Sequence, residues 1–125
     1  MPRTTLVLPT PANAGDVNVT TSQTNLLAPG TTITAGSNVG GAPLGDADAY
    51  ALVIANTGAT NMDVILWLSA GPNAGLRAQL TATVNAGAVY TYQVSGNAAR
   101  AMAVTATVAA GTTTARADLN AVTFA

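Results

Sequence analysis

The sequence has no cysteine, histidine, lysine or glutamate, so its 4 basic residues are all arginine and its 5 acidic residues are all aspartate. General acid–base and nucleophilic catalysis near neutral pH usually depends on histidine, cysteine or lysine. We therefore expect that the protein is not an enzyme and that it has no catalytic residue and no cofactor. Because cysteine is missing, the chain also has no disulfide framework and no thiolate metal site.

Charged residues are scarce: they make up 7% of the 125 residues, against about 25% in an average soluble domain. Four arginines balanced by five aspartates form no basic stripe, so we expect no binding to nucleic acid. No apolar run approaches the roughly 18 residues that span a bilayer, and residues 6–8 are too short a run for a signal peptide. The sequence therefore predicts one folded domain, made in the cytoplasm, with no membrane partner.

The apolar content of 49% includes 27 alanines, which leaves few large side chains for a core. A buried valine or leucine contributes roughly 1.5–3 kcal/mol, whereas a methyl group contributes much less. We therefore expect a thin core and a protein that gains stability by association. A surface with so little charge also loses little on desolvation when it assembles.

From Tyr50 onward, apolar residues recur at every second position between clusters of glycine, asparagine, serine and threonine. This alternation predicts half-buried strands, and turns every eight to twelve residues are typical of a sandwich or barrel. The predicted fold class is all-β: an antiparallel β-sandwich or β-barrel with an extended N-terminal arm. The strands are expected at residues 49–56, 63–69, 79–84, 89–94, 102–108 and 114–124. Apolar residues on both faces of 63–69 predict a central strand, and a parity change near the end predicts a β-bulge at 118–120.

The chain divides into three parts by composition. Residues 1–20 are predicted to be an extended N-terminal arm, and residues 21–49 a loop-rich segment with proline, glycine and threonine. Residues 50–125 hold the sandwich or barrel core. On the arm, Arg3 is the best candidate for a contact with another molecule, because an isolated arginine in a chain this poor in charge favours a specific partner.

Two groups of residues could in principle bind a ligand. Asp46 and Asp48 offer two carboxylates, but without the further ligands of a calcium loop we expect a structural loop and no metal site. Four aromatic residues fall in the predicted strands, and aromatic side chains that share one sheet face can stack on a sugar. We expect instead that they pack in the core or an interface; they are Tyr50, Trp67, Tyr90 and Tyr92.

Three segments resemble the small head-decoration, or cement, proteins of tailed bacteriophages. They are an extended start reading Arg3-Thr-Thr-Leu, a strand and turn reading Leu52-Val-Ile-Ala-Asn-Thr-Gly-Ala-Thr60 followed by Asp63-Val-Ile-Leu66, and a turn and strand reading Val84-Asn-Ala-Gly-Ala-Val-Tyr-Thr-Tyr92. The near absence of charge and the long segment between Gly30 and Gly45 depart from that pattern.

The resemblance implies a structural virion protein that binds the outer surface of an icosahedral capsid and reinforces contacts between major capsid subunits. It assigns the arm to neighbouring capsid subunits and the β domain to the outside. The implied partners are the major capsid protein and neighbouring copies of this chain, with a homotrimer suggested by analogy. The implied arm contacts are Arg3, Thr4, Leu6, Val7 and Leu8.

Two other functions remain open at this point. One is a β-sandwich module that binds carbohydrate or a host surface, with the aromatic residues as its platform. The other is a jelly-roll coat subunit, which would form closed particles when it is expressed alone.

Overall fold

The computed structural model describes residues 3–7, 15–44, 47–71, 73–96 and 98–124, with the backbone alone for 3–7 and 122–124. This part of the chain contains ten strands and no helix, hence no helix long and apolar enough to cross a membrane. The strands are β1 (Arg3–Val7), β2 (Val17–Val19), β3 (Thr24–Asn25), β4 (Ala42–Pro43), β5 (Ala49–Asn56), β6 (Met62–Ser69), β7 (Arg77–Val84), β8 (Val89–Val94), β9 (Ala101–Thr107) and β10 (Thr113–Phe124).

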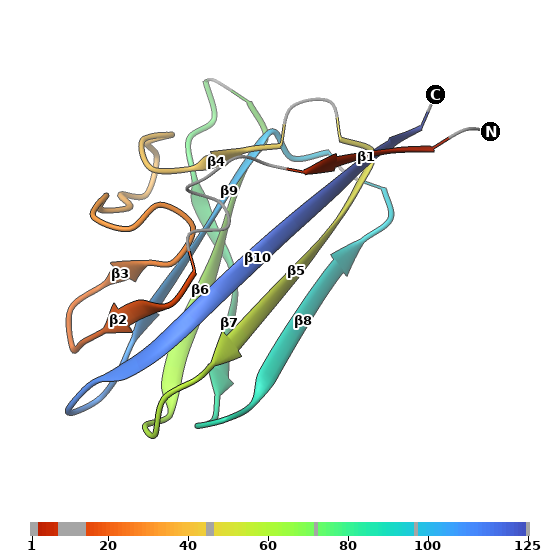
Figure 1. Ribbon diagram of the computed structural model, residues 1–125. Coiled ribbons are helices and arrows are strands. Elements are labelled where there is room, and N and C mark those ends of the chain that lie inside the picture. The colour runs from red at the N-terminus through yellow and green to blue at the C-terminus, as the bar shows by residue number, and fades with distance from the viewer. Residues whose placement is uncertain (1–2, 8–14, 45–46, 72, 97, 125) are drawn as a thin grey trace.

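The strands form two five-stranded antiparallel sheets that face each other as the layers of a sandwich (Figure 1). In sheet A, β10 pairs with β5 on one side and with β1 and β2 on the other, and β8 pairs with β5. In sheet B, β9 pairs with β6 on one side and with β3 and β4 on the other, and β7 pairs with β6. The predicted all-β antiparallel sandwich is therefore confirmed.

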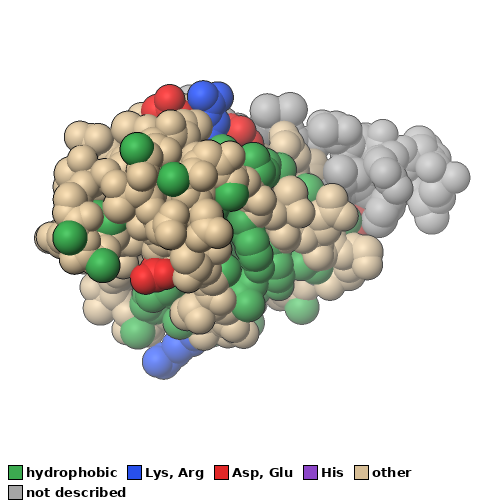
Figure 2. Space-filling view, turned by 90° about the horizontal axis from the view of Figure 1, so that it is seen from below, with side chains coloured by type: hydrophobic (Ala, Val, Ile, Leu, Met, Phe, Trp, Pro, Cys, Tyr) green, Lys and Arg blue, Asp and Glu red, His purple; other side chains and the backbone are tan. Residues whose placement is uncertain are grey.

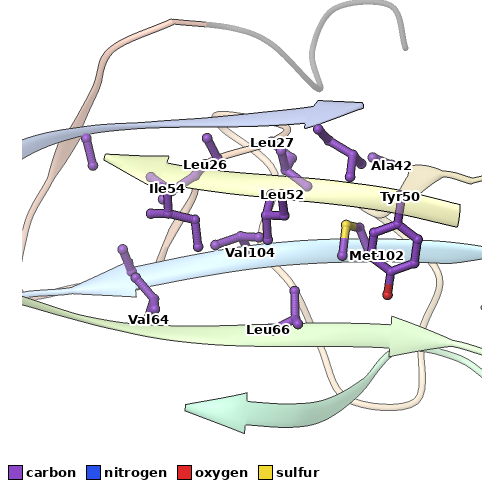
Figure 3. Close-up of a cluster of buried hydrophobic side chains, with 14 of the residues drawn as sticks. Leu26, Leu27, Ala42, Tyr50, Leu52, Ile54, Val64, Leu66, Met102 and Val104 are labelled. Atoms are coloured by element: carbon purple, nitrogen blue, oxygen red, sulfur yellow. The ribbon is translucent and has the colours of Figure 1, made fainter. Parts of the chain in front are cut away.

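The core lies between the sheets, where the alternation of each strand sends every second side chain inward. On β5 the inward residues Tyr50, Leu52 and Ile54 are buried, and their outward neighbours are half-buried. Figure 3 shows Leu52 and Ile54 pointing from β5 toward Val104 of β9 across the gap between the layers. Leu26 and Leu27, which follow β3, are fully buried in the same cluster.

Asn56 joins three chain segments at the end of β5. Its side chain is buried, and its Nδ2 donates to the carbonyl oxygens of Thr60 at 2.8 Å and Val84 at 2.9 Å. Its Oδ1 accepts a hydrogen bond from Thr113 Oγ1 at 2.8 Å. Because a buried amide is costly when it lacks partners, this network fixes how the β5–β6 turn sits against β7 and β10.

The predicted bulge at 118–120 is wrong. β10 pairs with β5 in unbroken register from Ala115 opposite Asn56 to Val122 opposite Ala49. The bulge lies in β7, because Leu80 is opposite Leu66 while Ala78 is opposite Trp67, which leaves Gln79 between them without a partner in β6. An extra residue of this kind bends the strand and increases its twist.

The described parts of the N-terminal 20 residues are extended and lie against β10. Arg3 of β1 is opposite Phe124, and Val7 is opposite Asn120, so the two ends of the described chain lie together (Figure 1). β2 pairs with the start of β10. Within the loop-rich segment 21–49, the two-residue strands β3 and β4 pair with β9.

Candidate functional site

The four aromatic residues of the strands do not share an exposed face. Tyr50 and Trp67 are buried, and Tyr90 and Tyr92 are half-buried against the main core. Trp67 lies in a separate apolar cluster of sheet B. The expectation that these side chains pack in the core is confirmed, and no flat platform for a sugar forms from them.

Trp67 belongs to a second apolar cluster on the outer face of sheet B. There it packs with Ile33, Leu76 and Ala103, and its indole Nε1 donates to Thr105 Oγ1 at 3.0 Å. The loop between β3 and β4, which carries Ile33 and Gly36, and the loop between β6 and β7, which carries Leu76, cover this cluster. The two loops are hydrogen-bonded to each other, because Gly36 N donates to Leu76 O at 2.8 Å. The loops therefore cover the part of the outer face of sheet B around Trp67, whereas Asp63, Thr81 and Thr83 on the same face are exposed.

In the described part of the chain, no comparable apolar cluster with a loop cover lies on the outer face of sheet A. One cross-strand row places Ala51 of β5 between Asn120 of β10 and Gln93 of β8. Because alanine is much smaller than its two neighbours, the row forms a shallow pocket of about 460 Å³. Its lining residues are Ala49, Tyr50, Ala51, Gln93, Val94, Ser95 and Asn120. No charged residue lines this pocket, so its polar chemistry is that of carboxamide and hydroxyl groups.

One edge of sheet A is formed by β8, which pairs with β5 and with no other strand that the structure describes. Its inward residues Tyr90, Tyr92 and Val94 are half-buried, and Val89 is 62% exposed. Seen from below, hydrophobic side chains form a continuous band across the surface of the molecule (Figure 2). Apolar surface is thus accessible on this side of the protein.

Tyr50 and Tyr92 form the one aromatic pair in the described part of the chain, with ring centroids 6.2 Å apart and planes tilted by 39°. Burial raises the pKa of Tyr50 to about 12, and the neighbouring Tyr92 adds to the shift. The Tyr50 hydroxyl therefore stays protonated at physiological pH, and it acts as a packing and hydrogen-bonding group.

The arm residues predicted to contact a capsid are only partly described. Arg3, Thr4, Leu6 and Val7 belong to β1, whose backbone lies beside the end of β10, and Leu8 lies outside the described residues. Their contact with a capsid stays a prediction. Asp46 also lies outside the described residues, and among those described no group of three metal-ligating side chains occurs.

The surface that sequence reasoning missed is the edge of β8. Its segment, Val-Tyr-Thr-Tyr-Gln-Val, carries neither charge nor proline, which is a readable signal. Nothing in that segment indicates, however, that the strand ends up at an edge, because the order of strands depends on long-range pairing.

No family model and no curated protein sequence matches the chain. Among solved structures, the fold is similar to the crystal structure of PirA, with 11% identity, a TM-score of 0.50 and coverage of 86% of this chain and 91% of that chain. It is also similar to a Bacillus endospore appendage protein from disulfide-linked pili, at 16% identity, a TM-score of 0.46 and coverage of 96% and 83%. A third similar structure is the unliganded CBM1 of BiXyn10A, at 13% identity, a TM-score of 0.42 and coverage of 98% and 97%. At such low identity, the likeness to PirA shows the fold alone.

Proposed function

We propose that this protein is a structural virion protein without catalytic activity, which binds the outer surface of an icosahedral phage capsid and reinforces contacts between major capsid subunits. The observation that carries the proposal is the uncharged part of the exterior of sheet A over β5 and β8, which lies apart from Arg116 and Asp118 on β10. Its exposed side chains on β8 are those of Val89, Thr91 and Gln93. Such a surface loses little on desolvation, so it suits broad contacts repeated across a lattice.

The arm supplies the second part of the proposal. β1 pairs with β10 on one side and with no second strand among those described. A strand held along one edge retains backbone groups for pairing with a strand of another protein. In the proposed complex, the contacts to the major capsid protein or a neighbouring copy come from Arg3, Thr4, Leu6, Val7 and Leu8.

Co-sedimentation with undecorated capsids of a host phage tests this proposal. We expect saturable binding at a fixed ratio to the major capsid protein. Deletion of residues 1–12 should abolish attachment, while circular dichroism shows that the β-sandwich stays folded. A deleted chain that still decorates capsids at full occupancy would refute the role of the arm, and a full-length chain that does not bind would refute the decoration function.

A carbohydrate-binding module is the second candidate, and the pocket over Ala51 is the observation that favours it. The carboxamides of Gln93 and Asn120 flank this pocket, and such groups donate and accept hydrogen bonds as sugar hydroxyls require. The buried positions of Tyr50 and Trp67 argue against it, because they remove the stacking platform. Binding to a glycan array, lost in Asn120→Ala, would favour this candidate over decoration.

A further inference from the structure

The four lateral edges of the two sheets differ in how far they are protected against pairing with another strand. β1 and β2 cover the outer side of β10, and β3 and β4 cover the outer side of β9. The edge strand β7 carries the exposed Arg77 and the bulge at Gln79, two features by which proteins block pairing with another strand. β8 has no charge, no proline and no register shift against β5, so its edge carries none of these protections (Figure 1).

The hydrogen-bonding phase of β8 follows from the pairing at its start. Asn56 N donates to Ala88 O at 3.0 Å, one residue beyond the β5–β8 ladder, and this bond sets the hydrogen-bonding phase of the ladder. Hydrogen-bonded positions alternate along antiparallel strands, so the backbone groups of Tyr90 and Tyr92 are hydrogen-bonded to β5. The backbone N–H and C=O groups of Val89, Thr91 and Gln93 consequently point away from β5, toward the edge.

We propose that β8 pairs antiparallel with β8 of a second copy, around a two-fold axis that passes beside Thr91. In this register Thr91 faces Thr91 of the partner subunit, and Val89 faces Gln93 of the partner subunit. Tyr90 then faces Tyr92 of the partner subunit on the inner side of the joined sheet. The inference goes beyond the proposed function, because it concerns the free protein and needs no capsid.

Two constraints select this register. Opposed residues must lie on the same face of the joined sheet, since side chains alternate in both strands. The hydrogen-bonded positions must be Val89, Thr91 and Gln93, whose backbone groups are directed to the edge. When the two-fold axis passes beside Thr91, all three of these residues face one another across the interface. When the axis passes beside Tyr92, only Thr91 and Gln93 do so, and Val89 faces Ser95 of the partner subunit, beyond the end of β8.

A second copy is the occupant that β8 fits best, because the strand is complementary to itself. The pairing brings threonine opposite threonine and tyrosine opposite tyrosine, and both kinds of cross-strand pair stabilise antiparallel sheets. No charged side chain of β8 meets its own image. An isologous contact of this kind closes on itself as a dimer rather than extending as a fibre.

Single cysteine variants test the register, because the chain contains no cysteine of its own. Hydrogen-bonded residues across an antiparallel pair have Cα atoms about 5.5 Å apart, which lies within the range for a disulfide. Thr91→Cys should form a disulfide-linked dimer on mild oxidation. Gln93→Cys and Val89→Cys should each stay unlinked alone and should form a heterodimer when they are mixed. Linkage of Gln93→Cys with itself would overturn the register.

Charged variants test the interface in solution by sedimentation velocity. Thr91→Asp and Thr91→Lys should each weaken the dimer by at least about tenfold, because like charges then face each other, and their mixture should restore it. Thr81→Asp, at an exposed position of β7, serves as the matched control and should leave the dimer unchanged. A wild-type chain that sediments as a monomer or a trimer would overturn the inference. So would a monomer whose β8 variants lose capsid binding, because the occupant would then be a strand of the shell.

Discussion

Sheet A and sheet B have the same number of strands but different exteriors. On sheet B, loops cover Trp67 with Ile33 and Leu76, and the edge strand β7 has a bulge and an exposed arginine. On sheet A, the outer face carries a shallow pocket over Ala51, and the edge strand β8 is regular and uncharged. Loops thus cover part of the outer face of sheet B, and we propose that sheet A is the layer that makes contacts with other molecules.

Trp67→Ala should cause the largest loss of stability, because it removes the centre of the covered cluster. Truncating a buried tryptophan costs about 3–5 kcal/mol in the free energy of unfolding, and Thr105 Oγ1 also loses its donor. Val53→Ala, on the outer face of sheet A, is the control and should cost less than about 1.5 kcal/mol. Urea denaturation measures both values. Equal losses would contradict the distinction between the two faces.

Gly75→Ala should have the next largest effect, because Gly75 adopts a φ of +69° and a Cβ there would overlap the backbone of Gly36. The left-handed strain and the overlap together should cost about 2–4 kcal/mol. Gly87→Ala has a similar φ of +75° with nothing within 4 Å of the added Cβ, so it isolates the strain at about 1–2 kcal/mol. If both variants lose the same stability, the two loops are not held against each other.

A smaller effect is expected at alkaline pH from Tyr50 on the inner face of sheet A. Its pKa is raised from 10.0 to about 12 in the folded protein, so the folded state holds this proton more tightly than the unfolded chain. The resulting stabilisation is fully present below pH 10 and is lost as the pH rises toward 12. The thermal midpoint of the wild type should fall more steeply over this range than that of Tyr50→Phe. Parallel curves would show that Tyr50 does not contribute.

The smallest effect is expected for Arg116→Ala on the outer face of sheet A. Arg116 Nε donates to Asp16 Oδ1 at 2.9 Å, but both side chains are about half exposed. Exposed ion pairs contribute about 0.2–1 kcal/mol and are screened by salt. We expect a loss in this range in low-salt denaturation and no difference at 1 M salt. A larger, salt-independent loss would indicate a structural role for this pair.

The long strands were predictable because the alternation of their side chains matches the two environments of each sheet. The predicted strand 49–56 coincides with β5, and the two-sided apolar segment 63–69 is β6, which lies centrally between β7 and β9. The alternation of side chains does not predict β3 and β4, because a two-residue strand is too short to show a periodic pattern. These two strands form through their pairing with β9.

The bulge and the loop cover were not predictable for a different reason. Leu119 and Val122 differ in parity, yet β10 keeps its register through both, and the extra residue is Gln79 in β7. A polar residue inside an alternating strand gives no sign that it lacks a partner. Likewise, Ile33 lies in the loop-rich segment, and nothing local indicates that it covers Trp67.

The proposed contact surfaces were predictable only in their amino-acid composition. The low charge of β8 is visible in the sequence, but its position at an edge depends on which strands pair. The arm residues, such as Arg3 and Leu6, were assigned through a family resemblance, and that assignment stays a prediction.

Backbone amide hydrogen exchange, measured residue by residue over a range of protein concentrations, tests most directly whether sheet A is the contact layer. At low concentration, the amides of Tyr90 and Tyr92 should exchange slowly, and those of Val89, Thr91 and Gln93 should exchange fast. As the concentration rises, these three amides should become protected together, while the amides of β7 keep their rates. Concentration-independent exchange at Thr91, or protection that arises in β7 instead, would contradict the account.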